Sequence, residues 1–213
     1  MKIISSREVL KNKLFTITDE VATDPSGFEI HRFIVRHPGS AVMMPVDDKD
    51  RVLLVKQFRL PAERELWELP AGRLDSGESP LKAAKRELRE ETGYKAKKWV
   101  KLASFWATPG YVDERMNLFL ALDLTQGKQE PMDDERIEIR WFSKAELGRL
   151  ISAGEILDGK TIIGYFLWNW IFPLARVQAK SRESAIRSLE GVPSTHRVLR
   201  ADPLIRTTLH AFC

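Results

Sequence analysis

The chain has 213 residues and a formal net charge of +4, and 43% of its residues are hydrophobic. That composition is typical of a folded globular protein and excludes general disorder. The charge excess is too small to indicate nucleic acid as a partner. The single cysteine, Cys213, excludes an intrachain disulfide framework and a multi-cysteine zinc site.

No segment of the sequence indicates export or membrane insertion. Residues 1–15 alternate apolar and charged side chains and lack the apolar core of a signal peptide. The longest apolar stretch, 161–175, is shorter than the roughly 20 residues that span a bilayer. Together with the single cysteine, these features predict a cytoplasmic protein without a membrane partner.

The first part of the chain predicts strands joined by turns. Residues 14–18 and 29–35 alternate in polarity on either side of an Asp-Pro-Ser-Gly turn at 24–27, as in a hairpin. Further strands are expected at 40–46 and 51–58, joined by an Asp-Asp-Lys-Asp turn at 47–50.

The polarity period changes after residue 78. Ser79 is a suitable N-cap, Pro80 a suitable first helical residue and Gly93 a suitable C-cap, so we expect a helix over 80–92. The remaining expected elements are strands at 99–107, 116–124 and 137–142, a helix from Ser143 to Ile151, and a helix from Asp158 that ends near Pro173. Helices and strands do not alternate regularly, which favours an α+β fold with a mixed sheet.

The helix expected over 80–92 brings three carboxylates to one face. Glu87, Glu90 and Glu91 are related by steps of three and four residues, so their charges repel one another. Such a face is either solvated and compensated by nearby lysine and arginine, or it binds a hard divalent cation that prefers oxygen ligands. The helix alone does not decide between the two.

The spacing of residues around this helix is more specific than its charge. The positions concerned are Gly72, Glu78, Arg86, Glu87, Leu88, Glu90, Glu91 and Gly93. In this order and spacing they resemble the Nudix box of the Nudix hydrolases. One position departs from the family pattern, because Tyr94 stands where an aliphatic residue is preferred. A match at this many positions favours the metal site over the solvated face.

The resemblance implies roles for the three glutamates on one face of the helix and for Arg86. Glu87, Glu90 and Glu91 would hold Mg²⁺ or Mn²⁺ together with the carbonyl oxygen of Ala71. Arg86 would orient the glutamates through charge-assisted hydrogen bonds, and both it and Glu90 belong to the implied catalytic set. A divalent cation in such a site promotes attack of water on a diphosphate.

Segments outside the box resemble the ADP-ribose pyrophosphatase branch of the family. They are the segments Gln57–Arg59, Leu69–Gly72 and Arg36–Gly39, and Pro109, which lies 16 residues after Gly93. The resemblance implies that Arg59, Arg36 and Pro109 contact the substrate. For both arginines the alternative is ordinary surface charge at a strand end.

An acidic segment at 133–138 resembles the loop that carries a further catalytic glutamate in this branch. The resemblance implies Glu135 as that residue, with Asp134 and Glu138 as alternatives. This residue would complete the catalytic set by taking a proton from the attacking water.

The resemblance also implies an architecture. A Nudix-type α/β/α sandwich is expected over 39–175, preceded by a small antiparallel sheet over 1–38. The segment 176–213 would be an extension, in which seven basic residues stand against three acidic ones. Proteins of this branch are typically homodimers in which the N-terminal sheet reaches the partner, so a homodimer is expected.

The sequence therefore predicts Mg²⁺-dependent hydrolysis of ADP-ribose to AMP and ribose 5-phosphate, with a small-molecule nucleoside diphosphate sugar as the partner. One alternative keeps the chemistry but changes the substrate to GDP-mannose, FAD or NADH. Another is a nucleotide-sensing module without turnover. The intact acidic set of the box disfavours the sensing module, because a pure binder does not need the whole metal cluster.

Overall fold

A computed structural model describes residues 1–129 and 136–170 of the chain. Residues Met1–Asn169 form one compact unit. The basic extension expected at 176–213 lies outside the described residues. No helix in the described part of the chain combines the length and the apolar content needed to cross a membrane.

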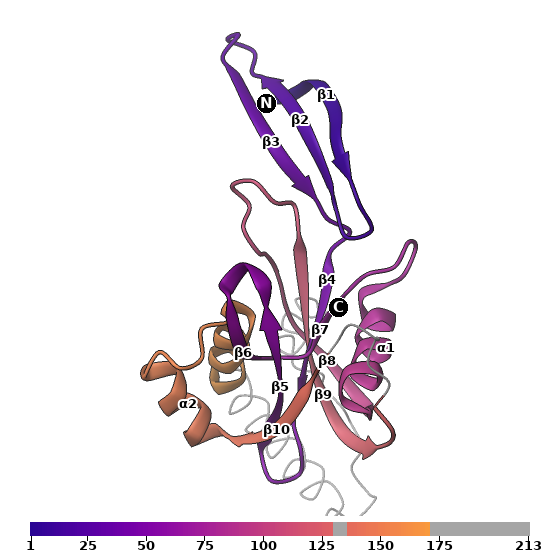
Figure 1. Ribbon diagram of the computed structural model, residues 1–213, viewed down its shortest axis with the longest axis vertical. Helices are drawn as coiled ribbons and strands as arrows, with labels where there is room; N and C mark the ends of the chain where they lie inside the picture. Colours follow the sequence, from indigo (N-terminus) through magenta and orange to yellow (C-terminus); the bar gives the residue numbers. More distant parts are fainter. Residues whose placement is uncertain (130–135, 171–213) are drawn as a thin grey trace, which may run out of the picture. The chain divides into compact units, whose positions relative to one another are not determined.

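The strands of the described residues form three sheets (Figure 1). The first is antiparallel, in the order β1 (Lys2–Lys11), β2 (Thr16–Thr23) and β3 (Glu29–Arg36). The second has the order β7 (Ala71–Arg73), β4 (Ser40–Pro45), β9 (Arg115–Gln126) and β8 (Tyr94–Trp106). The third has the order β10 (Glu138–Ser143), β5 (Arg51–Arg59) and β6 (Arg64–Glu68). Because β4 pairs with β9 in parallel while the other pairs of named strands in the described residues are antiparallel, the predicted α+β class with a mixed sheet is confirmed.

The helices are α1 (Pro80–Thr92), α2 (Lys144–Ser152), a helical segment at 159–170 and the short 3₁₀ helix η1 (Leu60–Ala62). The signals at the ends of α1 act as expected. The Ser79 side chain accepts a hydrogen bond from the backbone N–H of Lys82, and Pro80 is the first helical residue. Gly93 ends the helix with φ of +75°, a left-handed conformation that glycine adopts without strain.

One face of α1 packs on the four-stranded sheet. Ala83, Ala84 and Leu88 are buried against side chains of β4 and β9, among them Met43. The helical period predicts Leu81 in this stripe as well, but Leu81 is 37% exposed. Small alanines let the helix lie close to the sheet, and this close packing brings the neighbouring glutamates to the strand edge.

α2 and the segment 159–170 both contact the three-stranded sheet that contains β5, α2 at β10 and the segment through Lys160 and Glu68 of β6. α2 begins after Ser143, whose side chain accepts from the N–H of Glu146, and it contacts β10. Phe142, Leu147 and Trp168 are buried there. The segment 159–170 also runs close to the strand connection that leads into β7. A Cβ atom on Gly164 would lie only 2.7 Å from Leu69 Cδ1.

Candidate active site

The metal-binding residues implied by the sequence meet where β7 runs along α1. The backbone N–H of Ala71 donates to Oε2 of Glu91 at 3.3 Å, and Glu91 is only 3% exposed. Gly72 faces the Glu87 side chain so closely that a Cβ atom at position 72 would overlap the Glu87 carboxylate. Two glutamates of α1 therefore lie against two consecutive residues of one strand.

Arg86 holds the acidic side chains of the box together. Its Nη1 donates to Oε1 of Glu87 at 2.6 Å and to Oε2 of Glu90 at 3.1 Å. Its Nη2 and Nε donate to the two carboxylate oxygens of Glu78 at 2.9 and 3.3 Å, and Nη2 also reaches the carbonyl oxygen of Arg73. A planar guanidinium with five donors is suited to binding three carboxylates at once.

The charges of this cluster stabilise one another. Hydrogen bonds to Glu78, followed by the charge of Glu87, raise the pKa of Arg86 above its ordinary value against the opposing effect of burial. The hydrogen bond from Arg86 in turn lowers the pKa of Glu78 below its ordinary value. Glu78 also accepts from the N–H of Asp75, so this carboxylate braces the loop in front of α1.

The donor set suits a hard divalent cation. Carboxylate oxygens of Glu87, Glu90 and Glu91 and the carbonyl oxygen of Ala71 are the ligand types that Mg²⁺ and Mn²⁺ prefer. Within residues 1–129 and 136–170, no three His, Cys, Asp or Glu side chains are gathered tightly enough to enclose an ion. The carboxylates of Glu87 and Glu90 are instead paired with Arg86. The donor types fit the cation.

Arg59 lies at the end of β5, beside this cluster. It forms a two-pronged ion pair in which Nε and Nη2 donate to the two carboxylate oxygens of Glu68, each at 2.8 Å. Hydrogen bonding to Glu68 raises the pKa of Arg59 against the effect of burial, and the charge of Glu91 adds to this rise. The Arg59 side chain remains 40% exposed. Nη1 of Arg59 takes no part in this ion pair.

The partner of Arg59 belongs to a buried ionic group that sequence reasoning missed. Glu68 is 2% exposed and also accepts from Nζ of Lys160, which is 8% exposed. Burial by itself would raise the pKa of Glu68, but the hydrogen bonds from Arg59 and the charge of Lys160 outweigh it and leave the pKa below its ordinary value. A charged residue between Trp67 and Leu69 was the available signal, because a glutamate in an apolar stretch needs a partner.

Arg36 and Pro109 line a different cavity, of about 240 Å³. Arg36 is engaged by two carboxylates: Nε and Nη2 donate to Glu20, and Nη1 donates to Asp113 at 3.0 Å. These bonds connect β3 to the turn that contains Pro109, and a bridge between Val35 and Val112 connects the same segments. Arg36 is thus held by the fold, and its guanidinium nitrogens all have protein partners.

Glu135, the expected further catalytic glutamate, lies outside the described residues, as does Asp134. Glu138 is the first residue of β10, and its carboxylate pairs with Nζ of Lys56 at 3.0 Å. Among the three acidic candidates from this part of the chain, Glu138 is therefore the one whose position the structure describes, and its charge has a lysine partner.

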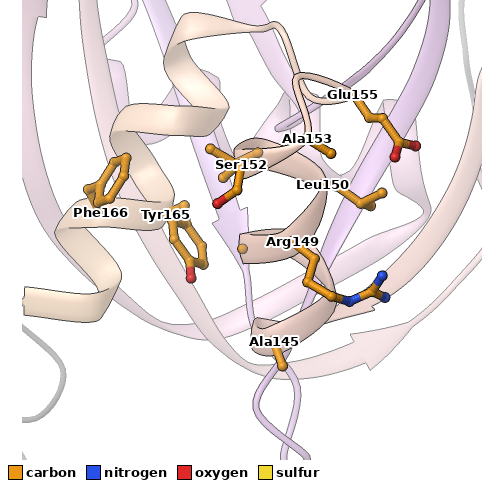
Figure 2. A pocket seen from close by; sticks show the side chains of 10 residues that line it. Ala145, Arg149, Leu150, Ser152, Ala153, Glu155, Tyr165 and Phe166 are labelled. Carbon is orange, nitrogen blue, oxygen red and sulfur yellow. The ribbon is translucent and has the colours of Figure 1, made fainter.

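A cavity of about 710 Å³ lies elsewhere, between α2 and the helical segment 159–170 (Figure 2). Arg149 and Glu155 come from α2 and the turn after it, and Tyr165 and Phe166 come from the helical segment. None of the residues implied by the Nudix box lines it. Its size alone therefore does not indicate where the chemistry takes place.

Comparison with known proteins identifies the family. Residues 35–162 match the NUDIX domain. The chain belongs to the Nudix family. An ADP-ribose pyrophosphatase of Bacillus subtilis is 38% identical over 75% of this chain and 88% of its own length. An ADP-ribose pyrophosphatase of Mycobacterium tuberculosis is 35% identical over 76% of this chain and 79% of its own length. The family predicted from the box is confirmed.

A solved structure supports the fold. The crystal structure of an ADP compounds hydrolase superposes with a TM-score of 0.71, covers 83% of this chain and 97% of its own, and is 22% identical in sequence. The Nudix-type arrangement of a mixed sheet between helices, with a small antiparallel sheet before it, is confirmed as the fold of this chain.

Proposed function

We propose that this Nudix protein hydrolyses ADP-ribose to AMP and ribose 5-phosphate in a reaction that requires Mg²⁺, with Mn²⁺ as the alternative ion. The observation that carries the proposal is the acidic face of α1, where Arg86 bonds to Glu87 and Glu90 and the strand edge of β7 lies against Glu91 and Glu87. The similarity to two ADP-ribose pyrophosphatases supports the substrate.

In this proposal the carboxylates of Glu87, Glu90 and Glu91 and the carbonyl of Ala71 bind the cation. When bound, the cation supplies stabilisation of charge on the diphosphate and activation of the attacking water. Arg86 keeps the carboxylates oriented, since it already donates to two of them. The buried Glu91 is held in place by its bond to the backbone of Ala71.

Arg59, Pro109 and Arg36 are assigned different roles in substrate binding. Arg59 binds a diphosphate oxygen through Nη1, the amino group that the Glu68 pair leaves over. Pro109 shapes the wall of the cavity that Arg36 also lines. Arg36 acts mainly by holding that wall to β3, because Glu20 and Asp113 already occupy its donors. Glu135 is proposed as the base that accepts the proton of the attacking water.

We propose further that the protein is a homodimer built through the N-terminal sheet of residues 1–38. All ten residues of β1 are exposed. Ile3, Ile4, Val9 and Leu10 are each about half exposed in one short strand. Apolar side chains gathered on a thin sheet lose solvent contact when a second copy covers them. The cytoplasmic location and the domain boundaries at residues 38 and 175 stay predictions.

The test is a product assay across candidate substrates. The chain is incubated with Mg²⁺ and each of ADP-ribose, GDP-mannose, UDP-glucose, diadenosine polyphosphates, FAD and NADH, and the nucleotide products are separated and quantified. The highest kcat/KM for ADP-ribose, with AMP as a product, is expected. A higher kcat/KM for another compound would overturn the substrate but keep the chemistry. Binding of ADP-ribose without turnover of any compound would favour the sensing module.

A further inference from the structure

The ion pair of Arg59 and Glu68 is connected to residues almost a hundred positions further along the chain. Oε2 of Glu68 accepts from Nη2 of Arg59 at 2.8 Å and from Nζ of Lys160 at 2.5 Å. Lys160 also donates to Oδ1 of Asp158 at 2.9 Å. Glu68 and Lys160 are both buried, so water does not replace either bond when it is lost.

A second set of bonds connects the same segment to the strand that leads into the box. The backbone N–H and hydroxyl of Thr161 donate to Oδ2 of Asp158 at 3.0 and 2.5 Å. The Thr161 oxygen in turn accepts from the backbone N–H of Leu69 at 2.7 Å. Because Leu69 follows Glu68 directly, two consecutive residues of this part of the chain are bonded to residues 158–161.

The charges of the group balance only when Lys160 is present. Glu68 and Asp158 are acidic, and Arg59 and Lys160 are basic. Without Lys160, Arg59 would be the one cation of this group beside the carboxylates of Glu68 and Asp158. These two negative charges would then weaken the attraction of Arg59 for an anionic ligand. The carboxylate of Glu68 would also lose one of its three donors and hold the guanidinium plane less firmly.

We propose that Lys160 is a positioning residue, which acts through the Glu68 carboxylate to orient Arg59 toward the substrate diphosphate. This inference rests on the proposed function in that it takes Arg59 to be the diphosphate contact. Lys160 bonds to Glu68 and Asp158, and neither of these carboxylates belongs to the box. Its effect reaches the ligand only through the carboxylate that both cations share.

The experiment is a double-mutant cycle of Lys160→Met and Glu68→Gln in the full chain. Each variant is titrated with ADP-ribose by calorimetry in EDTA, which measures binding without turnover, and its KM and kcat for ADP-ribose are measured with Mg²⁺. Lys98→Met is the matched control, because Lys98 is an exposed lysine whose partner is Asp123 on the neighbouring strand. Thermal unfolding of every variant reports whether it is folded.

Lys160→Met is expected to weaken ADP-ribose binding and to raise KM, each by about tenfold, the size of a lost charge-assisted hydrogen bond. The kcat is expected to stay within about threefold, because Arg59 binds the diphosphate in the ground state as well as in the transition state. Adding Lys160→Met to Glu68→Gln is expected to cost less than about twofold more.

Additive losses in the double variant, an unchanged KM for Lys160→Met, or a loss confined to kcat would each overturn the inference. If Lys160→Met does not fold, Lys160→Gln replaces it, since glutamine removes the charge but keeps a polar end in the buried group. Failure of both variants to fold would assign the group to stability alone and overturn the inference. If the wild-type chain turns over a different nucleoside diphosphate, the proposed substrate fails, and the same cycle is measured with that compound.

Discussion

The carboxylate of Glu87 occupies the space that a side chain at Gly72 would need. Because Glu87 is a long side chain, a methyl group at position 72 displaces its carboxylate more readily than it displaces the backbone. A side chain at position 72 would therefore disturb metal binding by Glu87 more than it would disturb folding. This explains in physical terms why a glycine precedes the helix that carries the glutamates.

Gly72→Ala is therefore expected to lower kcat by at least tenfold and to weaken Mn²⁺ binding, while the midpoint of thermal unfolding changes little. The displaced Glu87 carboxylate can no longer reach the cation in the same geometry. Calorimetric titration with Mn²⁺ and steady-state kinetics check this. Gly159→Ala is a matched control, because a Cβ atom there meets no atom within 4 Å. Full activity of Gly72→Ala would contradict the assignment of Glu87.

Glu91→Gln is expected to lower kcat by orders of magnitude without unfolding the chain. The amide oxygen still accepts from the N–H of Ala71, but a neutral amide replaces an anion that the cation needs. Activity is measured over a range of Mg²⁺ concentrations, with circular dichroism as the check on folding. Glu155→Gln, at the cavity beside α2, serves as the control. A rate near that of the wild type would refute the metal role of Glu91.

Arg36→Met is expected to lower the free energy of unfolding by about 1.5–3 kcal/mol at pH 7, the range for hydrogen bonds to charged groups. The hydrogen bond from Arg36 is the main reason why the pKa of Glu20 lies below its ordinary value of 4.5. A lowered pKa stabilises the folded state above the ordinary value, and that contribution is lost as the pH falls through the folded-state pKa.

The difference between wild type and Arg36→Met is therefore expected to be largest near pH 7 and to shrink as the pH drops below 4.5. Urea unfolding followed at several pH values from 7 to 3 measures it. Arg32→Met is the control, because the Arg32 side chain on the same strand donates to the backbone carbonyl of His31. A difference that stays constant with pH would show that the ion pair with Glu20 does not stabilise the sheet.

Leu10→Asp is expected to shift the chain from dimer to monomer. Leu10 is 47% exposed on β1, and a carboxylate in a dimer contact would be buried without a partner. Sedimentation velocity at several protein concentrations measures the change. Val100→Asp on β8 removes a similarly exposed apolar side chain outside the N-terminal sheet and should leave the assembly unchanged. A monomeric wild-type chain would contradict the proposed dimer directly.

Much of the fold could be predicted because its signals are local. Ser79, Pro80 and Gly93 end α1 where their own backbone preferences require it, and the 24–27 turn closes the hairpin of β2 and β3. The short strands β6 and β7 were not predicted. Their residues, 64–68 and 71–73, carry no clear alternation, and they become strands only by pairing with β5 and β4.

The candidate site also has a part that the sequence predicts and a part that only the fold reveals. Periodicity puts Glu87, Glu90 and Glu91 on one side of a helix, but it does not reveal that Glu91 is 3% exposed and bonded to β7. Periodicity also does not predict the environment of Arg36. In the fold, Glu20 and Asp113 from two other segments form ion pairs with this arginine.

The sequence by itself determined the family, the ends of α1 and the acidic set, because these depend on residues close together along the chain. Only the tertiary structure decided which charges share a partner. Glu68 and Lys160 are 92 positions apart, and neither residue carries a local signal for the other. Their contact exists because β6 and the helical segment 159–170 are packed together, and a buried charge is stable only where the fold supplies its counter-charge.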